Sequence, residues 1–287
     1  MNKKIFLLGV GAQKCGTTWL HSQISKVQSV DMGFKKEYHV FDTIFSEHRK
    51  RSKENLIKIV ENRNKKTENK SPQNTPIAKR LSFIDNPENY FDYFNSLYLK
   101  DENVELVGDI TPSYSMLNRD AFQYIKDGLE SRGFNVKVVF LMRDPLERIW
   151  SMQRMSRRNQ AKKGVAVSVS EDEQLKTRYF STQTQLKTDY PRTITELESV
   201  FPEKDIYYGF YETLFTESSY KSLSDFLTIP LDEPDFDFKA NVSPKNLDLN
   251  SELKSEIVNA YKHVYDALNT KTNGDIKGVW GGYDYIK

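Results

Sequence analysis

The chain has 287 residues, enough to bury a sizeable core in one large α/β domain or two small ones. Its 42 Lys and Arg nearly balance 40 Asp and Glu, so the formal net charge of +2 creates no overall field that would favour nucleic acid as a partner. The single cysteine excludes an internal disulfide framework and a cysteine-rich zinc site, and it suits a reducing cytoplasm. No apolar run approaches the roughly 20 residues of a membrane span, so we expect a cytoplasmic protein without one.

The chain begins with a predicted strand, loop and helix. Residues 5–10 form an apolar run of the kind that becomes a buried strand, and the sequence then continues as GAQKCGTTWL. A helix follows, which Thr17 or Thr18 can cap and which ends near residue 26.

The loop between this strand and helix departs from a nucleotide-triphosphate P-loop in one respect. Gly11 and Gly16 have the P-loop spacing, but Thr17 stands where the lysine belongs, and the lysine occurs earlier as Lys14. A helix N-terminus presents free backbone N–H groups and the positive end of its dipole, and Thr18 adds a second hydroxyl. These features predict a binding site for a phosphate-like anionic group, in a ligand that is not ATP. The alternative is an ordinary strand-to-helix turn with an exposed lysine.

A segment rich in charged and aromatic residues, FKKEYHVFD, follows at residues 34–42. A Lys-Glu-x-His cluster bounded by aromatic residues has no necessary chemistry by itself. Surface charge around a packed histidine is its ordinary interpretation.

The stretch from residue 49 to residue 80 is strongly basic, with eleven Lys and Arg against three Glu. Its few apolar residues cannot build a core, so we expect a basic insertion at about residues 43–100. It is either a solvated segment or a basic rim that attracts an anionic substrate.

Three further apolar runs predict strands at residues 104–107, 136–142 and 206–210. After the second of these, Asp144 and Pro145 occupy the N-cap and first helical positions of a helix, on which we expect Arg148 as a surface or ion-pair residue.

Helical patterns also cover residues 211–227 and 253–268. Apolar runs that alternate with helices are typical of a parallel sheet covered on both faces. We therefore predict an α/β fold, P-loop-like and three-layered, with a central parallel sheet flanked by helices in a single domain over residues 1–287.

The first loop resembles the 5′-phosphosulfate-binding loop of sulfotransferases, whose pattern is Gly-x-x-Lys-x-Gly-Thr-Thr-x-Leu. These enzymes transfer a sulfuryl group from 3′-phosphoadenosine 5′-phosphosulfate (PAPS). The resemblance implies donor binding by the following loop residues: Gly11, Lys14, Cys15, Gly16, Thr17, Thr18 and Trp19. Cys15 is expected to fill a small space beside the lysine.

A second element, FLMRDPLERIWSM, resembles the part of sulfotransferases that binds the 3′-phosphate of PAPS. In that element a strand ends in Arg and a Ser follows eight residues later on the next helix, which here are Arg143 and Ser151. An arginine offers phosphate a planar fork of donors, and the serine adds a hydroxyl two helical turns away.

The segment FKKEYHVFD resembles Lys-Glu-x-His-Phe-Phe-Asp of heparan sulfate and related carbohydrate sulfotransferases. The resemblance implies that Glu37 is the catalytic base, with His39 as the alternative base or as the residue that orients Glu37. Lys14 would stabilise the bridging oxygen as 3′,5′-ADP leaves. The segment GDITPSYS resembles a third family element, in which Ile110 replaces a lysine, and Lys36 is a candidate to compensate.

The expected activity is therefore transfer of a sulfuryl group from PAPS to a hydroxyl of a carbohydrate or other small acceptor, by in-line displacement and without a metal. The basic stretch favours an anionic acceptor. One alternative is a P-loop kinase or NTPase-like phosphotransferase, with Asp109 as its magnesium ligand, although Thr17 occupies the place of its lysine. The other is a non-catalytic protein that binds a nucleotide and a polyanion.

Overall fold

The computed structural model describes residues 4–64, 75–165, 169–238 and 248–286. Their strands form one five-stranded sheet in the order β2-β3-β1-β4-β5, with every neighbouring pair parallel. The strands are β1 (Ile5–Gly11), β2 (Val30–Asp31), β3 (Leu106–Ile110), β4 (Asn135–Met142) and β5 (Ile206–Phe210). The predicted α/β fold with a central parallel sheet is confirmed.

The central strands are apolar because both faces of the sheet are covered. Every residue of β1 and β3 is buried, and so is most of β4. The strand predicted at residues 104–107 lies about two residues later, and the one predicted at 206–210 is confirmed. The short edge strand β2 was not predicted, since two residues carry no periodic pattern.

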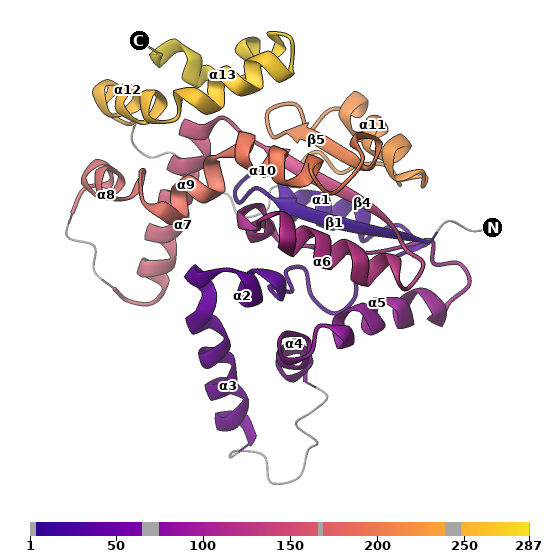
Figure 1. Cartoon of the computed structure of the whole chain (residues 1–287). Helices are drawn as coiled ribbons and strands as arrows, with labels where there is room; N and C mark the ends of the chain where they lie inside the picture. Colours follow the sequence, from indigo (N-terminus) through magenta and orange to yellow (C-terminus); the bar gives the residue numbers. More distant parts are fainter. Residues whose placement is uncertain (1–3, 65–74, 166–168, 239–247, 287) are drawn as a thin grey trace.

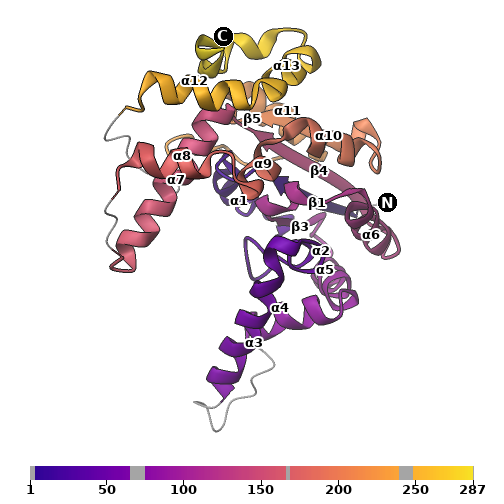
Figure 2. The ribbon, with the colours of Figure 1, turned by 60° about the vertical axis from the view of Figure 1, so that its left-hand side comes forward.

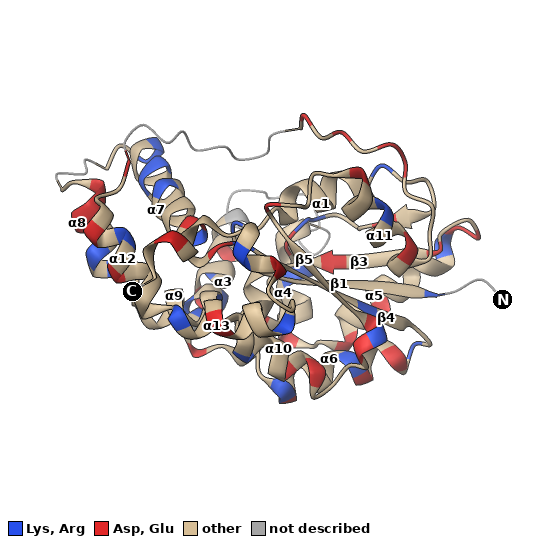
Figure 3. Ribbon diagram, turned by 90° about the horizontal axis from the view of Figure 1, so that it is seen from above, with Lys and Arg blue, Asp and Glu red and all other residues tan. Residues whose placement is uncertain are grey.

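Helices form a layer on each side of the sheet (Figure 3). One layer contains α1 (Thr17–Ile24) and α11 (Glu217–Leu227), and the other contains α5 (Glu88–Lys100), α6 (Arg119–Glu130) and α10 (Tyr190–Glu198). Phe6 of β1 lies in the core, where its ring contacts those of Tyr90, Phe94 and Phe134. The sheet and its helix layers thus share one hydrophobic core, because the apolar face of each helix must pack against another element.

The basic stretch belongs to an arm that projects from the sheet and its layers (Figures 1 and 2). The arm contains α2 (Phe41–Phe45), α3 (Lys50–Asn64) and α4 (Pro76–Asp85). Residues 65–74, in the middle of the predicted insertion, lie outside the described residues. After the arm, the chain returns to the sheet in α5, which packs Tyr90, Phe91 and Phe94 into the core.

The remaining helices gather beyond the carboxyl ends of the strands (Figure 1). They are α7 (Pro145–Lys162), α8 (Glu171–Arg178), α9 (Thr182–Thr188), α12 (Ser251–Ala260) and α13 (Lys262–Lys271). The side chain of Asp144 accepts from the backbone N–H of Leu146, with Pro145 in the first turn, so this predicted helix start is confirmed. In the described ranges, no helix is long and apolar enough to cross a membrane.

Two predicted helix boundaries are wrong. The helix predicted from residue 211 begins at Glu217, because Thr216 caps it with a hydrogen bond from the backbone N–H of Ser219. The last predicted helix is divided at Tyr261 into α12 and α13. Short 3-10 turns complete the chain: Glu47–Arg49, Pro112–Met116, Glu203–Asp205, Asp275–Gly278 and Gly281–Tyr285.

Candidate active site

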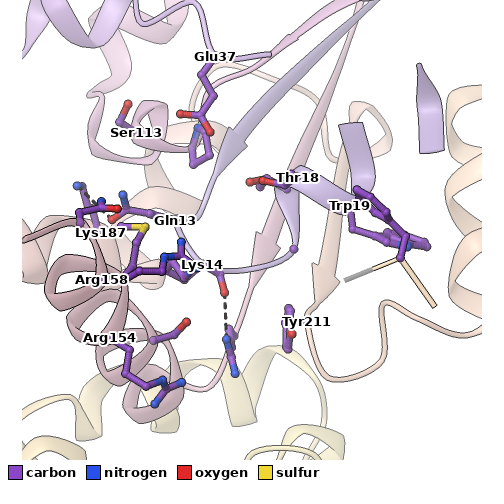
Figure 4. Close-up of a pocket in the computed structure, with 18 of the residues that line it drawn as sticks. Gln13, Lys14, Thr18, Trp19, Glu37, Ser113, Arg154, Arg158, Lys187 and Tyr211 are labelled. Atoms are coloured by element: carbon purple, nitrogen blue, oxygen red, sulfur yellow. Dashed lines mark hydrogen bonds between the residues drawn. The ribbon is translucent and has the colours of Figure 1, made fainter. Parts of the chain in front are cut away.

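A cavity of about 890 Å³ lies at the carboxyl ends of the central strands, and Figure 4 shows it in close-up. The loop after β1, the turn after β3 and the turn after β4 all contribute to its lining. Nine residues predicted or considered for the site line it: Lys14, Gly16, Thr17, Thr18, Trp19, Glu37, His39, Arg143 and Ser151. Two predicted donor-binding residues, Gly11 and Cys15, do not line it.

The loop after β1 needs its two glycines for backbone geometry. Gly11 and Gly16 have φ angles of 140° and 88°, in the region that favours glycine. A Cβ on Gly16 would also lie 2.5 Å from a side-chain carbon of Leu214. Gly16 is the N-cap of α1 and Thr17 is its first residue, so the predicted threonine cap is wrong. The first N–H groups of α1 lack partners within the helix, and Thr17 and Thr18 line the cavity.

Lys14 lies in the cavity among other cations. Burial, together with Arg158, Arg143 and Arg154, lowers the pKa of its ammonium group from 10.5 to about 8. A lysine whose charged form is disfavoured in this way gains from an anion placed beside it. The electrostatics of this part of the cavity therefore favour a ligand with several negative charges.

Cys15 does not line the cavity and is fully buried. Its Sγ lies 4.0 Å from the hydroxyl oxygen of Tyr190, and burial raises the pKa of the thiol to about 12. The residue fills space beneath the loop, and a thiol with this pKa is not a nucleophile at neutral pH.

The second predicted anion element meets the first at the same cavity. Arg143, directly after β4, donates to the backbone carbonyl of Lys14 at 3.3 Å, and its guanidinium pairs with Glu147 at 3.2 Å. The same guanidinium lies over the ring of Tyr211, 4.1 Å from its centre. Ser151, two turns along α7, is 7% exposed and lines the cavity. The two motifs thus form one site.

Glu37 and His39 belong to a chain of hydrogen-bonded acidic and basic groups. Glu37 Oε1 lies 2.5 Å from Lys36 Nζ, and Glu37 Oε2 lies 3.2 Å from His39 Nε2. His39 Nδ1 lies 2.8 Å from Oδ2 of the buried Asp42, which also pairs with Arg49 at 2.9 Å. In Figure 4, Glu37 lies at the upper end of the cavity with Lys14 below it.

These contacts set the protonation of the pair. Burial alone would raise the pKa of Glu37, but the hydrogen bonds from His39 and Lys36 outweigh it and lower that pKa to about 2. Burial alone would lower the pKa of His39, but hydrogen bonds to Asp42 and Glu37 outweigh it and raise that pKa. Glu37 is therefore ionised, and His39 is held ready to carry a proton.

The segment GDITPSYS supports the cavity more than it enters it. Asp109 is fully buried and accepts hydrogen bonds from the hydroxyls of Tyr90, Thr111 and Tyr114 at 3.1, 2.7 and 2.8 Å. Burial raises its pKa to about 6. Because three hydroxyls occupy its oxygens, Asp109 is not placed as the magnesium ligand that a kinase would need. Ile110, in place of the family lysine, is also fully buried.

Ser113 is the member of this segment with a polar side chain at the cavity. Its hydroxyl donates to Asp42 at 2.5 Å and lies 3.1 Å from His39 Nδ1. Among the residues that the structure describes, no group of three or more His, Cys, Asp or Glu is placed to hold a metal ion.

Several cavity residues were not predicted. On α7, the side chains that follow Ser151 at spacings of three, four, seven and eight share its face, and this helical spacing was the signal that could have found them. The other additional residues come from distant parts of the chain and have no such signal. Missed residues are Gln13, Arg49, Arg154, Met155, Arg158, Asn159, Lys187, Tyr211, Phe215, Phe236 and Phe238.

Aromatic side chains form one wall of the cavity. The ring of Trp19 stacks on that of Phe236, with centroids 6.0 Å apart and planes 13° from parallel, and it meets Phe215 edge-on at 5.1 Å. Trp19 Nε1 donates to the carbonyl of Asp235 at 2.8 Å, which fixes the indole. A flat, weakly polar ligand group suits such a wall.

Arg148 was expected on the surface of α7 or in an ion pair, and the surface position is wrong. The residue is fully buried, because the first two turns of α7 are buried on nearly every side by the sheet end and its neighbours. Its guanidinium nitrogens have no hydrogen-bond partner among the described residues. It does not line the cavity.

A buried network holds the turn that carries Arg143. Glu212 accepts from the backbone N–H of Asp144 at 3.0 Å and from Trp280 Nε1 at 3.2 Å. Asp144 accepts in turn from the hydroxyl of Tyr265 at 2.6 Å and from the backbone N–H of Gly282 at 2.6 Å. The C-terminal segment therefore supports the cavity from behind.

Two solved structures share this fold. A sulfotransferase from Alicyclobacillus acidocaldarius aligns with a TM-score of 0.59 and 15% identity over 97% of this chain and 98% of that chain. The sulfotransferase domain of the olefin synthase from Synechococcus PCC 7002 aligns with a TM-score of 0.50 and 16% identity over 85% of this chain and 82% of that chain. No curated protein sequence matches the chain.

The family model described as "Sulfotransferase domain" matches residues 3–263. This span contains every residue of the loop after β1, of the Glu37 segment and of the Arg143 to Ser151 element. The kinase alternative is thereby set aside, and the chain belongs to the sulfotransferase family.

Proposed function

We propose that the protein transfers the sulfuryl group of PAPS to a hydroxyl group and releases 3′,5′-ADP. The observation that carries this proposal is the pair of anion-binding elements at one cavity, joined by the hydrogen bond from Arg143 to the carbonyl of Lys14. PAPS has two anionic groups on one nucleoside, a 5′-phosphosulfate and a 3′-phosphate. A nucleotide with a phosphate group only at its 5′ position would leave Arg143 and Ser151 without a ligand.

The assignment of donor groups follows the positions of the side chains. The loop from Lys14 to Thr18 would hold the 5′-phosphosulfate at the N-terminus of α1, where helix N–H groups and a cation favour an anion. Arg143 and Ser151 would hold the 3′-phosphate. The aromatic wall around Trp19 and Phe236 would receive the adenine.

We assign proton removal to Glu37 together with His39. As the acceptor oxygen bonds to sulfur, its proton must leave, and a group within hydrogen-bond reach can take it. With a pKa of about 2, the resting Glu37 carboxylate is a weak base. When His39 is neutral, with its proton on Nδ1 toward Asp42, its Nε2 lies 3.2 Å from Glu37 and can take up the proton that Glu37 removes. Asp42 then stabilises the resulting imidazolium.

Lys14 acts at the other end of the displacement. While the bond from sulfur to the bridging oxygen breaks, its ammonium group stabilises the charge that develops on that oxygen. Positioning and charge stabilisation of this kind dominate related phosphoryl transfers. The proposed reaction uses no metal.

The acceptor is proposed to be a carbohydrate or another small hydroxyl compound, and an anionic one. The Glu37 segment resembles that of the carbohydrate sulfotransferases. The acceptor side of the cavity also carries Arg49 and Lys187, which favour a negatively charged compound.

A thermal-shift comparison tests the donor. We expect 3′,5′-ADP to raise the unfolding temperature far more than 5′-AMP or ATP with magnesium does, because only 3′,5′-ADP fills both anion elements. Equal shifts from all three nucleotides contradict the proposal. Labelled PAPS with a panel of anionic and neutral sugars then tests transfer, and binding without transfer to any of them favours the non-catalytic alternative.

We also propose that residues 1–287 form one domain and work in the cytoplasm. Among the described residues, one buried cluster of apolar side chains includes members from Ile5 to Trp280, and this supports one domain. The lone, buried Cys15 suits a reducing compartment.

A further inference from the structure

Arg154 is a buried cation on the cavity face of α7. Its side chain is only 9% exposed and lines the cavity, yet its Nε and Nη1 have no hydrogen-bond partner among the described residues. Its guanidinium lies over the ring of Trp150, 4.5 Å from the ring centre. A buried guanidinium with two unpaired nitrogens is costly, and an anionic ligand is the kind of group that removes this cost.

The position of Arg154 places it at the donor end of the cavity. Residues three apart on a helix are neighbours on one face, so Arg154 lies beside Ser151. Figure 4 shows Arg154 at the end of the cavity away from Glu37, with Lys14 between them. A ligand that Arg154 contacts is therefore on the side of the nucleotide rather than of the acceptor.

Charge balance at this end calls for a second cation. A phosphate monoester carries roughly −1.5 to −2 at neutral pH. Arg143 is already paired with Glu147 at 3.2 Å, so much of its charge is neutralised before a ligand arrives. Among the described residues Arg154 forms no ion pair within 4 Å, and the carboxylates of Glu147 and Glu171 stabilise its charge from a greater distance. Its guanidinium therefore keeps donors for a ligand.

We propose that Arg154 binds the 3′-phosphate of the donor nucleotide together with Arg143 and Ser151. This inference rests on the proposed function, since it takes a 3′-phosphorylated nucleotide as the ligand. It assigns to α7 a residue that the sequence motif did not include, and it explains why this helix has a cation one turn beyond the serine.

Binding of 3′,5′-ADP and 5′-AMP, measured by isothermal titration calorimetry, tests the inference without any acceptor. Arg154→Met removes the charge and keeps an apolar side chain on Trp150, and Arg154→Lys keeps the charge. Arg157→Met is the matched control, because Arg157 lies on the same helix but donates to Val169 and Gln174 outside the cavity.

In Arg154→Met we expect the affinity for 3′,5′-ADP to fall by about tenfold to a hundredfold and the affinity for 5′-AMP to change by less than about twofold. Arg154→Lys should keep most of the preference for 3′,5′-ADP, and Arg157→Met should keep all of it. If Arg154→Met weakens both nucleotides equally, or if it keeps the wild-type preference, the inference is overturned.

The same experiment separates this inference from the proposed function. A wild-type protein that binds 3′,5′-ADP no better than 5′-AMP contradicts the proposed function itself, and the inference fails with it. The melting temperature of each variant without ligand is the folding control. If Arg154→Met does not fold, Arg154→Lys is compared with Arg154→Gln. An equal preference for 3′,5′-ADP over 5′-AMP in these two variants overturns a role for the charge of Arg154.

Discussion

Lys14 leads to a quantitative prediction about pH. Burial and the cations Arg158, Arg143 and Arg154 lower the pKa of its ammonium group to about 8. In the free protein, roughly nine-tenths of the molecules then carry this charge at pH 7 and roughly one-tenth at pH 9. If an anionic ligand needs the charged form, its affinity should fall about tenfold between pH 7 and pH 9.

The assay is calorimetric titration with 3′,5′-ADP across this pH range. Arg stays protonated throughout it, so Lys14→Arg should bind with nearly constant affinity. Lys14→Ala should bind about tenfold to a hundredfold more weakly at pH 7, because a charge-assisted contact is lost, and it should show no further fall up to pH 9.

Lys187 provides the strictest check of this reasoning. Burial and its neighbours Arg148 and Arg49 lower the pKa of Lys187 to about 8 as well. If Lys14→Arg still loses affinity tenfold between pH 7 and pH 9, the titrating group is not Lys14, and Lys187→Met should then remove the fall. A wild-type affinity that does not change with pH refutes the need for a charged lysine.

Three further predictions concern other parts of the site. Glu37→Gln should lower sulfuryl transfer at least about a hundredfold and leave the affinity for 3′,5′-ADP unchanged, and undiminished turnover would remove Glu37 as base. Gly16→Ala should lower both the melting temperature and nucleotide affinity, because φ is 88° and Leu214 leaves no room; unchanged binding would contradict the loop geometry. Burial raises the folded-state pKa of Glu212 from 4.5 to about 7, so its contribution to stability is full below about pH 4.5 and is lost as the pH rises through 7. Between pH 4.5 and pH 7, the melting temperature of Glu212→Gln should therefore fall less steeply with pH than that of the wild type. An equal slope in the two proteins would contradict this role of Glu212.

The two anion elements that the sequence predicts begin directly after central strands. The loop after β1 and the Arg143 turn after β4 are short, contiguous patterns, and β1 pairs with β4 along most of its length. Because the carboxyl ends of neighbouring parallel strands meet at one edge, two such loops must be adjacent. The sequence alone therefore predicts that the two anion elements lie at one site.

The part that the sequence did not predict depends on packing between distant segments. Lys187 reaches the cavity from α9, and Phe236 and Phe238 reach it from a stretch after α11. No short pattern marks these residues, because their positions depend on how distant segments pack together. Arg148 shows the converse error, because a charged residue in an amphipathic helix was assigned to the surface and is fully buried.

The hydrogen bond from Arg143 to the carbonyl of Lys14 adds a constraint that neither motif contains by itself. It fixes the side chain of the proposed 3′-phosphate element to the backbone of the proposed 5′ loop at 3.3 Å. The turn that carries Arg143 is in turn held by Glu212 through the backbone N–H of Asp144. The distance between the two anion elements is therefore set by the fold before a nucleotide binds. On the proposed assignment, the cavity would select its ligand by the spacing of two anionic groups. A comparison of nucleotides with and without the 3′-phosphate is therefore a more decisive test of the proposal than the affinity for any one nucleotide.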